Sequence, residues 1–255
     1  MSTLMYEEDL LDDEVVDEDP LTPFLDDGTI VEVLGELKSG KEGTVYCCRP
    51  HPTLGVDLVA AKVFRGREER TFRNQAGYRE GRPILNQRDA RAYKKKTAWG
   101  RRVETGTWLR HEYEILDLLF GAGGSVPRPL ASTSNVILME FIGDEESAAP
   151  KLQETELQEL EAIELFEKVI ENIELFLSRN WIHADLSAYN ILYWHGEISI
   201  IDFPQAVDAR TNRNASMLLT RDIENVCRYF RKQGVESDPE AISRRLWRRY
   251  VRAEL

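Results

Sequence analysis

Alternating apolar and polar residues mark the first folded part of the chain as β-structure. The alternation runs through residues 30–34 and resumes at residues 44–48, with a Ser-Gly-Lys-Glu-Gly turn between the two runs. This order predicts a hairpin closed by a glycine loop. Apolar runs at residues 56–64 and 136–142 predict two more strands, and helical spacing predicts a helix over residues 104–119 between them.

Helical periodicity dominates the second half of the chain. Residues 154–178 carry apolar side chains at intervals of three and four positions, which predicts a long amphipathic helix. Its expected apolar face consists of Leu157, Leu160, Ile163, Phe166, Val169, Ile170, Ile173 and Phe176. Two short strands near residues 191–194 and 198–201 and two helices near residues 215–232 and 239–253 are expected to follow.

These elements predict an α+β fold with two lobes. An antiparallel sheet and one long helix are expected within residues 28–142, and a mainly helical lobe within residues 143–255. The boundary is placed at residue 143 because residues 143–150 are the first linker-like stretch after the last strand of the sheet.

Charge is distributed unevenly along the chain. Residues 1–37 contain 13 acidic residues and no Lys or Arg, whereas residues 65–102 contain 13 Lys and Arg against 4 acidic residues. High charge without sustained periodicity predicts a mostly disordered acidic tail at residues 1–27 and a basic insert at residues 65–102. The insert is a candidate for binding RNA, but a basic run is more often a solvated loop, and no aromatic platform for base stacking accompanies it.

The composition also argues against several classes of protein. No apolar run approaches the roughly 18 residues of a membrane span, and the acidic start of the chain is unlike a signal peptide. Three cysteines without metal-ligand spacing favour a reducing compartment over a disulfide framework. We therefore expect a cytoplasmic protein with no membrane partner.

Two motifs in the second half carry the strongest chemical signal. Residues 183–190 read His-Ala-Asp-Leu-Ser-Ala-Tyr-Asn, and residues 200–203 read Ile-Ile-Asp-Phe. Asp185, Asn190 and Asp202 supply oxygen ligands of the kind that Mg²⁺ bound to substrate phosphates requires. In the kinase template the first Asp accepts the proton of the attacking hydroxyl, while the Asn and the second Asp hold metal. A polar surface turn explains either motif alone but explains the pair poorly.

The glycine loop is a weaker candidate for binding phosphate. It contains Ser39, Gly40, Lys41, Glu42 and Gly43. Two glycines allow backbone amides to approach an anion without a Cβ in the way, although a glycine turn in a hairpin is most often only a turn. The spacing does not match a Walker loop.

Lys62 interrupts an otherwise apolar strand. A lone lysine of this kind is often just exposed, but this one follows a glycine loop and precedes a helix that carries Glu112 and Glu114. That order matches the kinase lysine, which holds the α- and β-phosphates, and the glutamate that positions it. Glu112 is the preferred partner and Glu114 the alternative.

Four motifs together resemble the RIO family of atypical serine/threonine kinases. They are Ser-Gly-Lys-Glu-Gly-Thr-Val-Tyr at residues 39–46, Met-Glu-Phe-Ile-Gly at 139–143, the stretch at 183–190, and Ile-Asp-Phe-Pro-Gln-Ala at 201–206. The resemblance implies ATP and Mg²⁺ as cofactors, with Mn²⁺ as a substitute, and transfer of the γ-phosphate to a protein hydroxyl, including autophosphorylation.

The resemblance also implies roles for individual residues. Asp185 is the implied proton acceptor, Asn190 and Asp202 are the implied metal ligands, and adenine is implied to bond to the backbone of Glu140 and Ile142. The insert matches a flexible loop of the family, whose members work in ribosomal subunit maturation, so a ribosomal particle or RNA is the implied partner of the insert.

Departures from ordinary kinases keep other functions open. Phe-Pro follows Asp202 in place of Phe-Gly, and no Ala-Pro-Glu segment is present, so we expect a truncated fold without an activation loop or peptide-docking platform. One alternative is a conformational ATPase that passes phosphate to Asp202 or to water on a large assembly. The others are a small-molecule phosphotransferase of the aminoglycoside or choline type and an inactive binding module.

Overall fold

A five-stranded antiparallel sheet forms the first lobe of the protein. The computed structural model describes residues 19–40, 43–64 and 98–255. The sheet has the order β1 (Ile30–Ser39), β2 (Gly43–Pro50), β3 (Val59–Phe64), β5 (Val136–Glu140) and β4 (Pro129–Ser132), and a short 3-10 helix, η1 (Pro52–Leu54), links β2 to β3. The predicted hairpin and both later strands are confirmed, whereas β4 was not predicted. Lys41, in the glycine loop, and most of the basic insert lie outside the described residues.

A glycine at the start of β2 allows three strands to meet. A Cβ on Gly43 would lie 2.1 Å from the carbonyl oxygen of Val63, at the end of β3. Such an approach is open only to glycine. Gly43 therefore allows the hairpin to pack closely against β3. The glycines at the turn of this hairpin, Gly40 and Gly43, also line a cavity between the lobes.

The last part of the expected, mostly disordered acidic tail docks on the sheet. Residues 22–26 form helix α1 (Thr22–Asp26), and the side chains of Leu21 and Phe24 are buried beside Ile30 in the core of the sheet. Two apolar residues three positions apart share one face of a single helical turn, which is enough to bury them against the sheet.

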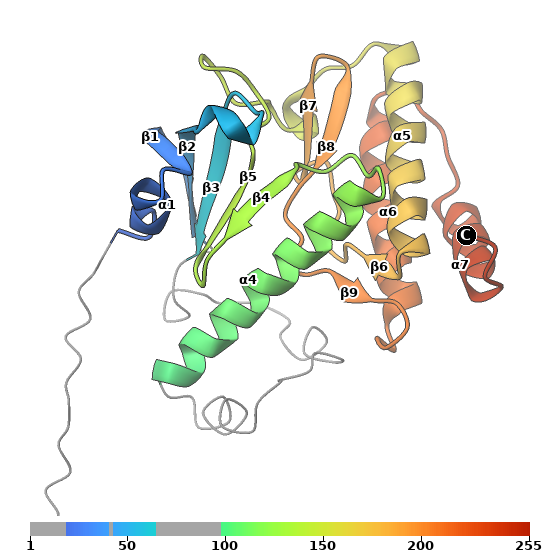
Figure 1. Ribbon diagram of the computed structural model, residues 1–255. Coiled ribbons are helices and arrows are strands. Elements are labelled where there is room, and N and C mark those ends of the chain that lie inside the picture. Colours follow the sequence, from blue (N-terminus) through green and yellow to red (C-terminus); the bar gives the residue numbers. More distant parts are fainter. Residues whose placement is uncertain (1–18, 41–42, 65–97) are drawn as a thin grey trace, which may run out of the picture.

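Helix α4 (Ala98–Gly121) runs diagonally across the sheet and reaches the second lobe (Figure 1). It begins before residue 104, so the last residues of the predicted insert are helical. Leu109 packs with Phe64 and Met139 of the sheet, whereas Leu116 and Leu119 belong to the core of the second lobe. One helix therefore fixes the position of each lobe relative to the other.

The second lobe is mainly helical, as predicted. It contains η3 (Leu152–Glu154), α5 (Glu159–Ser178), β6 (Trp181–Ile182), β7 (Ile191–Trp194), β8 (Glu197–Ile200), β9 (Val207–Asp208), α6 (Ala215–Lys232) and α7 (Pro239–Val251). Strand β7 pairs with β8, and β6 pairs with β9. In Figure 1, α5 and α6 lie side by side next to the β7–β8 hairpin, with α7 on the outer side. Within the described residues, none of the helices combines the length and apolar character that crossing a bilayer requires.

The apolar face predicted for the long helix is wrong at its first turns. Leu160 is 77% exposed and Ile163 is 39% exposed, whereas Val169, Ile173 and Phe176 are buried. Helix α5 begins at Glu159, five residues later than predicted, because residues 152–154 form the separate helix η3. The apolar periodicity of the sequence includes the first turn of α5, but no other element of the described structure covers Leu160 and Ile163 there.

Candidate active site

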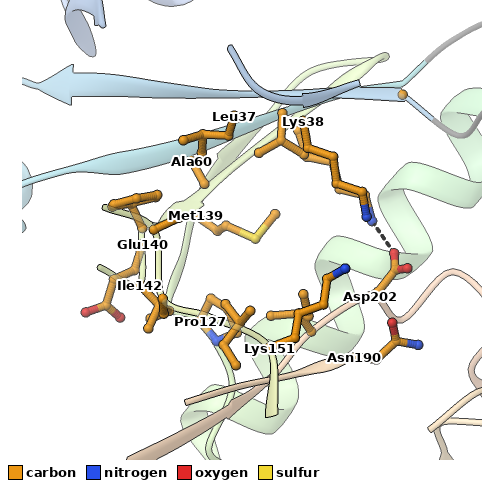
Figure 2. Close-up of a pocket in the computed structure, with 18 of the residues that line it drawn as sticks. Leu37, Lys38, Ala60, Pro127, Met139, Glu140, Ile142, Lys151, Asn190 and Asp202 are labelled. Atoms are coloured by element: carbon orange, nitrogen blue, oxygen red, sulfur yellow. Dashed lines mark hydrogen bonds and ion pairs between the residues drawn. The ribbon is translucent and has the colours of Figure 1, made fainter. Parts of the chain in front are cut away.

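A cavity of about 420 Å³ lies between the two lobes. Its apolar walls include Leu37, Val45, Ala60, Met139, Leu192 and Ile201, and its polar groups include Lys38, Lys62, Glu112, Lys151, Asn190 and Asp202. Figure 2 shows Met139, Glu140 and Ile142 at one end of the cavity and Asn190 and Asp202 at the other. A flat apolar group and a polyanionic group therefore fit the two ends of one ligand.

Lys62 connects the lobes through two ion pairs. Its Nζ lies 2.8 Å from Glu112 Oε1 on α4 and 2.6 Å from Asp202 Oδ1, and the latter pair is the dashed line at Asp202 in Figure 2. Lys62 therefore pairs with Glu112, the preferred partner, whereas Glu114 is exposed and pairs with Arg110 at 2.8 Å. Lys62 and Asp202 are 140 positions apart in the sequence, so their contact joins the two lobes.

Burial and charge act against each other in this cluster. Burial disfavours the ammonium, but the charges of Asp202 and Glu112 outweigh it and raise the pKa of Lys62. Burial likewise works against the Asp202 carboxylate, yet Lys62 lowers the pKa of Asp202. Burial dominates at Glu112, where it raises the pKa despite Lys62. Lys62 and Asp202 are therefore held in their charged forms.

The stretch at residues 183–190 places the Asp185 carboxylate near Asp202, outside the lining of the cavity. Asp185 is exposed and does not line the cavity itself, and partial burial together with the nearby Asp202 raises its pKa. Asn190 Nδ2 donates a 2.9 Å hydrogen bond to the backbone oxygen of Asp185. Ala184 and Asp202 adopt left-handed backbone conformations with φ of 63° and 74°. Such strain in non-glycine residues is typical of functional sites.

His183 supports the same stretch from the interior. Its ring is buried and lies 4.7 Å from the ring of Phe203, and Nε2 is 3.1 Å from the carbonyl oxygen of Ile201. Burial lowers the pKa of His183 to about 4, so the ring is neutral at physiological pH. The His183 ring therefore links residues 183–190, before β7, to residues 201–203, after β8, and it adds no charge to the site.

Asp222 was not predicted as a site residue, although it holds the stretch at 183–190 in place. Its side chain on α6 is buried and accepts hydrogen bonds from the backbone N–H groups of Ala184 at 2.7 Å and Leu186 at 3.0 Å. These two residues flank Asp185. Asn225, one turn further along α6, donates to the Leu186 carbonyl oxygen at 3.0 Å. The signal available in the sequence was an aspartate on the apolar face of a predicted helix.

The segment after β5 forms the apolar end of the cavity. Glu140 and Ile142, the predicted adenine-binding residues, both line it, and the Ile142 carbonyl oxygen accepts a 2.9 Å hydrogen bond from the Ala149 N–H. Gly143 has a φ of 142°, and a Cβ there would lie 2.4 Å from the Ser147 carbonyl oxygen. The tight turn at Gly143 thus returns the chain to Ile142, beside the cavity.

The glycine loop is only partly described. Gly40 and Gly43 line the cavity, but Ser39 does not, and the Ser39 hydroxyl lies 3.2 Å from the Thr44 hydroxyl across the hairpin. Lys41, predicted to bind ATP, lies outside the described residues. The structure therefore brings every other predicted site residue to the lining of the cavity except Asp185 and Ser39.

Asn190 and Asp202 fit a magnesium ion that also binds phosphate. Figure 2 shows the Asn190 amide beside the Asp202 carboxylate, and its nitrogen is already committed to the Asp185 carbonyl. Among the described residues no group of three or more His, Cys, Asp and Glu side chains is arranged to hold a metal ion. Two oxygen donors without a full protein cage are what Mg²⁺ uses when a substrate phosphate completes its shell.

Comparison with known proteins gives a consistent result. A family model described as the RIO domain matches residues 44–242. The chain is 30% identical over 221 residues to the RIO-type serine/threonine-protein kinase Rio1 of Haloferax volcanii, covering 86% of this chain and 70% of the relative. It is 30% identical over 223 residues to the human serine/threonine-protein kinase RIO1, covering 84% of this chain but only 36% of the human protein.

A solved structure confirms the predicted two-lobed fold. The chain superposes on the Rio2 kinase of Chaetomium thermophilum, solved as an ADP/Mg²⁺-phosphoaspartate complex, with a TM-score of 0.64 and 19% sequence identity. The match covers 88% of this chain and 64% of the Rio2 chain. An antiparallel sheet with one long helix, followed by a mainly helical lobe, is thus the shared architecture.

Proposed function

The chain belongs to the RIO domain family, and we propose that it is an ATP- and magnesium-dependent serine/threonine protein kinase. The observation that carries the proposal is the contact of Lys62 with both Glu112 and Asp202 at the polar end of the cavity. This arrangement positions an ammonium for nucleotide phosphates and a carboxylate for a metal ion in a single site. The curated relatives named above are RIO-type kinases, which supports the same conclusion.

The residues divide the work of phosphoryl transfer. Adenine would occupy the apolar end and bond to the backbone of Glu140 and Ile142, which line the cavity. Lys62 would contact the phosphates, while Glu112, its ion-pair partner, fixes the position of its ammonium. Asn190 and Asp202 are the residues that would hold Mg²⁺, which supplies charge neutralisation to the phosphates when bound. Asp185, whose pKa is raised by partial burial and by the nearby Asp202, accepts the proton of the attacking hydroxyl.

A second candidate function is a conformational ATPase. In this reaction an Asp202 oxygen attacks the γ-phosphorus, the bond from phosphorus to the bridging oxygen breaks, ADP leaves and an acyl phosphate remains for hydrolysis by water. The lowered pKa of Asp202 keeps its carboxylate ionised, as this step requires. The phosphoaspartate in the Rio2 complex favours this candidate.

One labelling experiment separates the two candidates. The protein is incubated with γ-labelled ATP and Mg²⁺, and label is followed into hydroxylamine-resistant phosphoprotein, hydroxylamine-sensitive acyl phosphate, free phosphate and small molecules. A kinase accumulates resistant label, and an ATPase accumulates acyl phosphate and free phosphate.

Asp202→Ala should weaken nucleotide binding in the presence of Mg²⁺, because a hard oxygen ligand is lost. Unchanged magnesium dependence in this variant would contradict the metal role.

The cellular partner and compartment belong to the proposal as well. We propose a cytoplasmic protein whose basic insert contacts a ribosomal particle or RNA, on the strength of the 13 basic residues within residues 65–102. A filter-binding titration with structured RNA tests this, and an insert with its arginines replaced by glutamine should lose most of the salt-dependent affinity. Equal affinity of the two proteins would contradict the role of the insert.

A further inference from the structure

Two lysines in the cavity have no role in the chemistry described so far. Lys38 is on β1 and Lys151 lies between β5 and η3, so one belongs to each lobe. Figure 2 shows Lys38 on the sheet side of the cavity and Lys151 on the opposite side, with the Lys151 side chain extending in the direction of Asp202. Both therefore face the polar end of the site.

Lys38 directly precedes the glycine loop and lines the cavity. It is exposed, and within the described part of the chain the structure gives Lys38 no ion pair of its own. An ammonium that lines a cavity without a carboxylate partner is placed to meet an anion.

Lys151 is held at the floor of the cavity by its backbone. Its main chain pairs with Leu192 of β7, and its side chain is 31% exposed. The Nζ atom lies 5.9 Å from the centre of the Tyr189 ring and 3.8 Å from Glu154 Oε1, and Glu154 is 58% exposed. An exposed pair at this distance contributes little, so Glu154 does not compete strongly with a ligand for Lys151.

A nucleotide carries more negative charge on its phosphates than Lys62 can balance. Lys62 is paired with two carboxylates, so the phosphate charge is left to Mg²⁺, when it is bound, and to the other cations of the cavity. Residues 183–190 contain no Lys or Arg, and His183 is neutral. Among the described residues that line the cavity, Lys38 and Lys151 are therefore the lysines left to balance the phosphates.

We propose that Lys38 and Lys151 bind the nucleotide phosphates from opposite lobes and make the site selective for the number of phosphates. The inference rests on the proposed function, since it assigns two specificity residues to the same nucleotide site. ATP carries one more phosphate than ADP and gains more from each ammonium. Because the two lysines belong to different lobes, a triphosphate that contacts both also holds the lobes together.

Affinity measurements on the full chain test this directly. Dissociation constants for ATP, ADP and AMP with Mg²⁺ are compared for the wild type, Lys38→Gln, Lys151→Gln and the control Lys168→Gln. Lys168 pairs with Glu197 and does not line the cavity. Each cavity variant should weaken ATP binding about 10-fold, ADP binding about 3-fold and AMP binding hardly at all, and the control should change none of them.

Three results would count against the proposal, and they are distinguishable. If the wild type binds no ATP, the proposed function is overturned as well. If the wild type binds ATP but the ATP-to-ADP affinity ratio is unchanged in both variants, only the role of the lysines is overturned. Equal loss for ATP and AMP would indicate structural damage in place of phosphate contact. Lys38→Arg and Lys151→Arg keep the charge, so both should retain the wild-type ratio.

Discussion

Two carboxylates, Glu112 and Asp222, are almost completely buried among the described residues, and they are stabilised in different ways. Glu112 is 1% exposed and faces the Lys62 ammonium at 2.8 Å. Asp222 is 2% exposed and faces two backbone N–H groups. The partner of Glu112 is a side chain that also contacts the proposed ligand, whereas the partners of Asp222 belong to the chain on either side of Asp185.

The difference separates a residue that takes part in binding from one that builds the site. Lys62 can exchange part of its contact with Glu112 and Asp202 for a phosphate, so the Glu112 pair responds to the ligand. The N–H groups of Ala184 and Leu186 have no such exchange, and Asp222 holds them whether or not a ligand is present. Loss of Asp222 should therefore affect folding, and loss of Glu112 should affect nucleotide binding.

The largest expected effect follows from removing Asp222. Asp222→Ala leaves two buried N–H groups without their acceptor, which should lower the free energy of unfolding by about 3 to 5 kcal/mol. Urea unfolding measures this, with Glu224→Ala on the same helix as a control that should change stability by less than about 1 kcal/mol. A loss for Asp222→Ala no greater than that of the control would refute the scaffolding role.

The second prediction concerns the residue that Asp222 holds in place. Asp185→Asn keeps the size of the side chain but removes the proton acceptor, so turnover should fall at least ~100-fold while ATP affinity and unfolding free energy stay close to the wild type. Initial rates with labelled ATP and a nucleotide titration give the two numbers. Unchanged turnover would show that the catalytic assignment of Asp185 is wrong.

The two regions were not equally predictable from the sequence. Lys62 was predicted because it is a charged residue in an apolar strand. Asn190 and Asp202 were predicted because they belong to motifs whose oxygen atoms are suited to Mg²⁺. Asp222 was missed as a site residue because its partners are backbone amides, and amides carry no sequence signal. Only the packing of α6 beneath residues 183–190 brings them together.

The same distinction applies to the fold. Long periodic elements such as α6 and the β1–β2 hairpin were predicted, since their own pattern specifies them. The two-residue strands β6 and β9 depend on contacts between distant segments, so no local pattern marks them. The burial of the apolar residues of α1 and the exposure of Leu160 likewise depend on which part of the folded protein lies opposite each of them. The local sequence does not specify this.

The third prediction uses the pH dependence of Asp222. Burial, opposed by the two N–H donors, raises its pKa from the ordinary range of an aspartate to about 7. The folded state thus binds a proton that the unfolded state has released, and stability contributed by Asp222 is lost as pH rises toward 7. Between pH 5 and pH 8, the unfolding free energy of the wild type minus that of Asp222→Asn should fall by on the order of 2 kcal/mol.

Taking the difference between the two proteins is essential because His183 acts in the opposite direction. Its pKa is lowered to about 4, so stability falls as pH drops below about 6.5, and this contribution cancels in the difference. Denaturant unfolding at intervals of half a pH unit gives the curve. A difference that is flat from pH 5 to pH 8 would show that Asp222 is ionised in the folded protein throughout.

The smallest effect is expected at Glu112, and α4 offers a matched control two residues away. Glu112→Gln keeps the shape of the side chain but removes the negative partner of Lys62, which then turns toward Asp202 alone. ATP affinity should fall about 10-fold, because the ammonium is no longer held at the phosphates. Glu114→Gln breaks only an exposed pair with Arg110, so its affinity should stay within about 2-fold. Equal affinities of the two variants would mean that Glu112, like Asp222, only supports the fold.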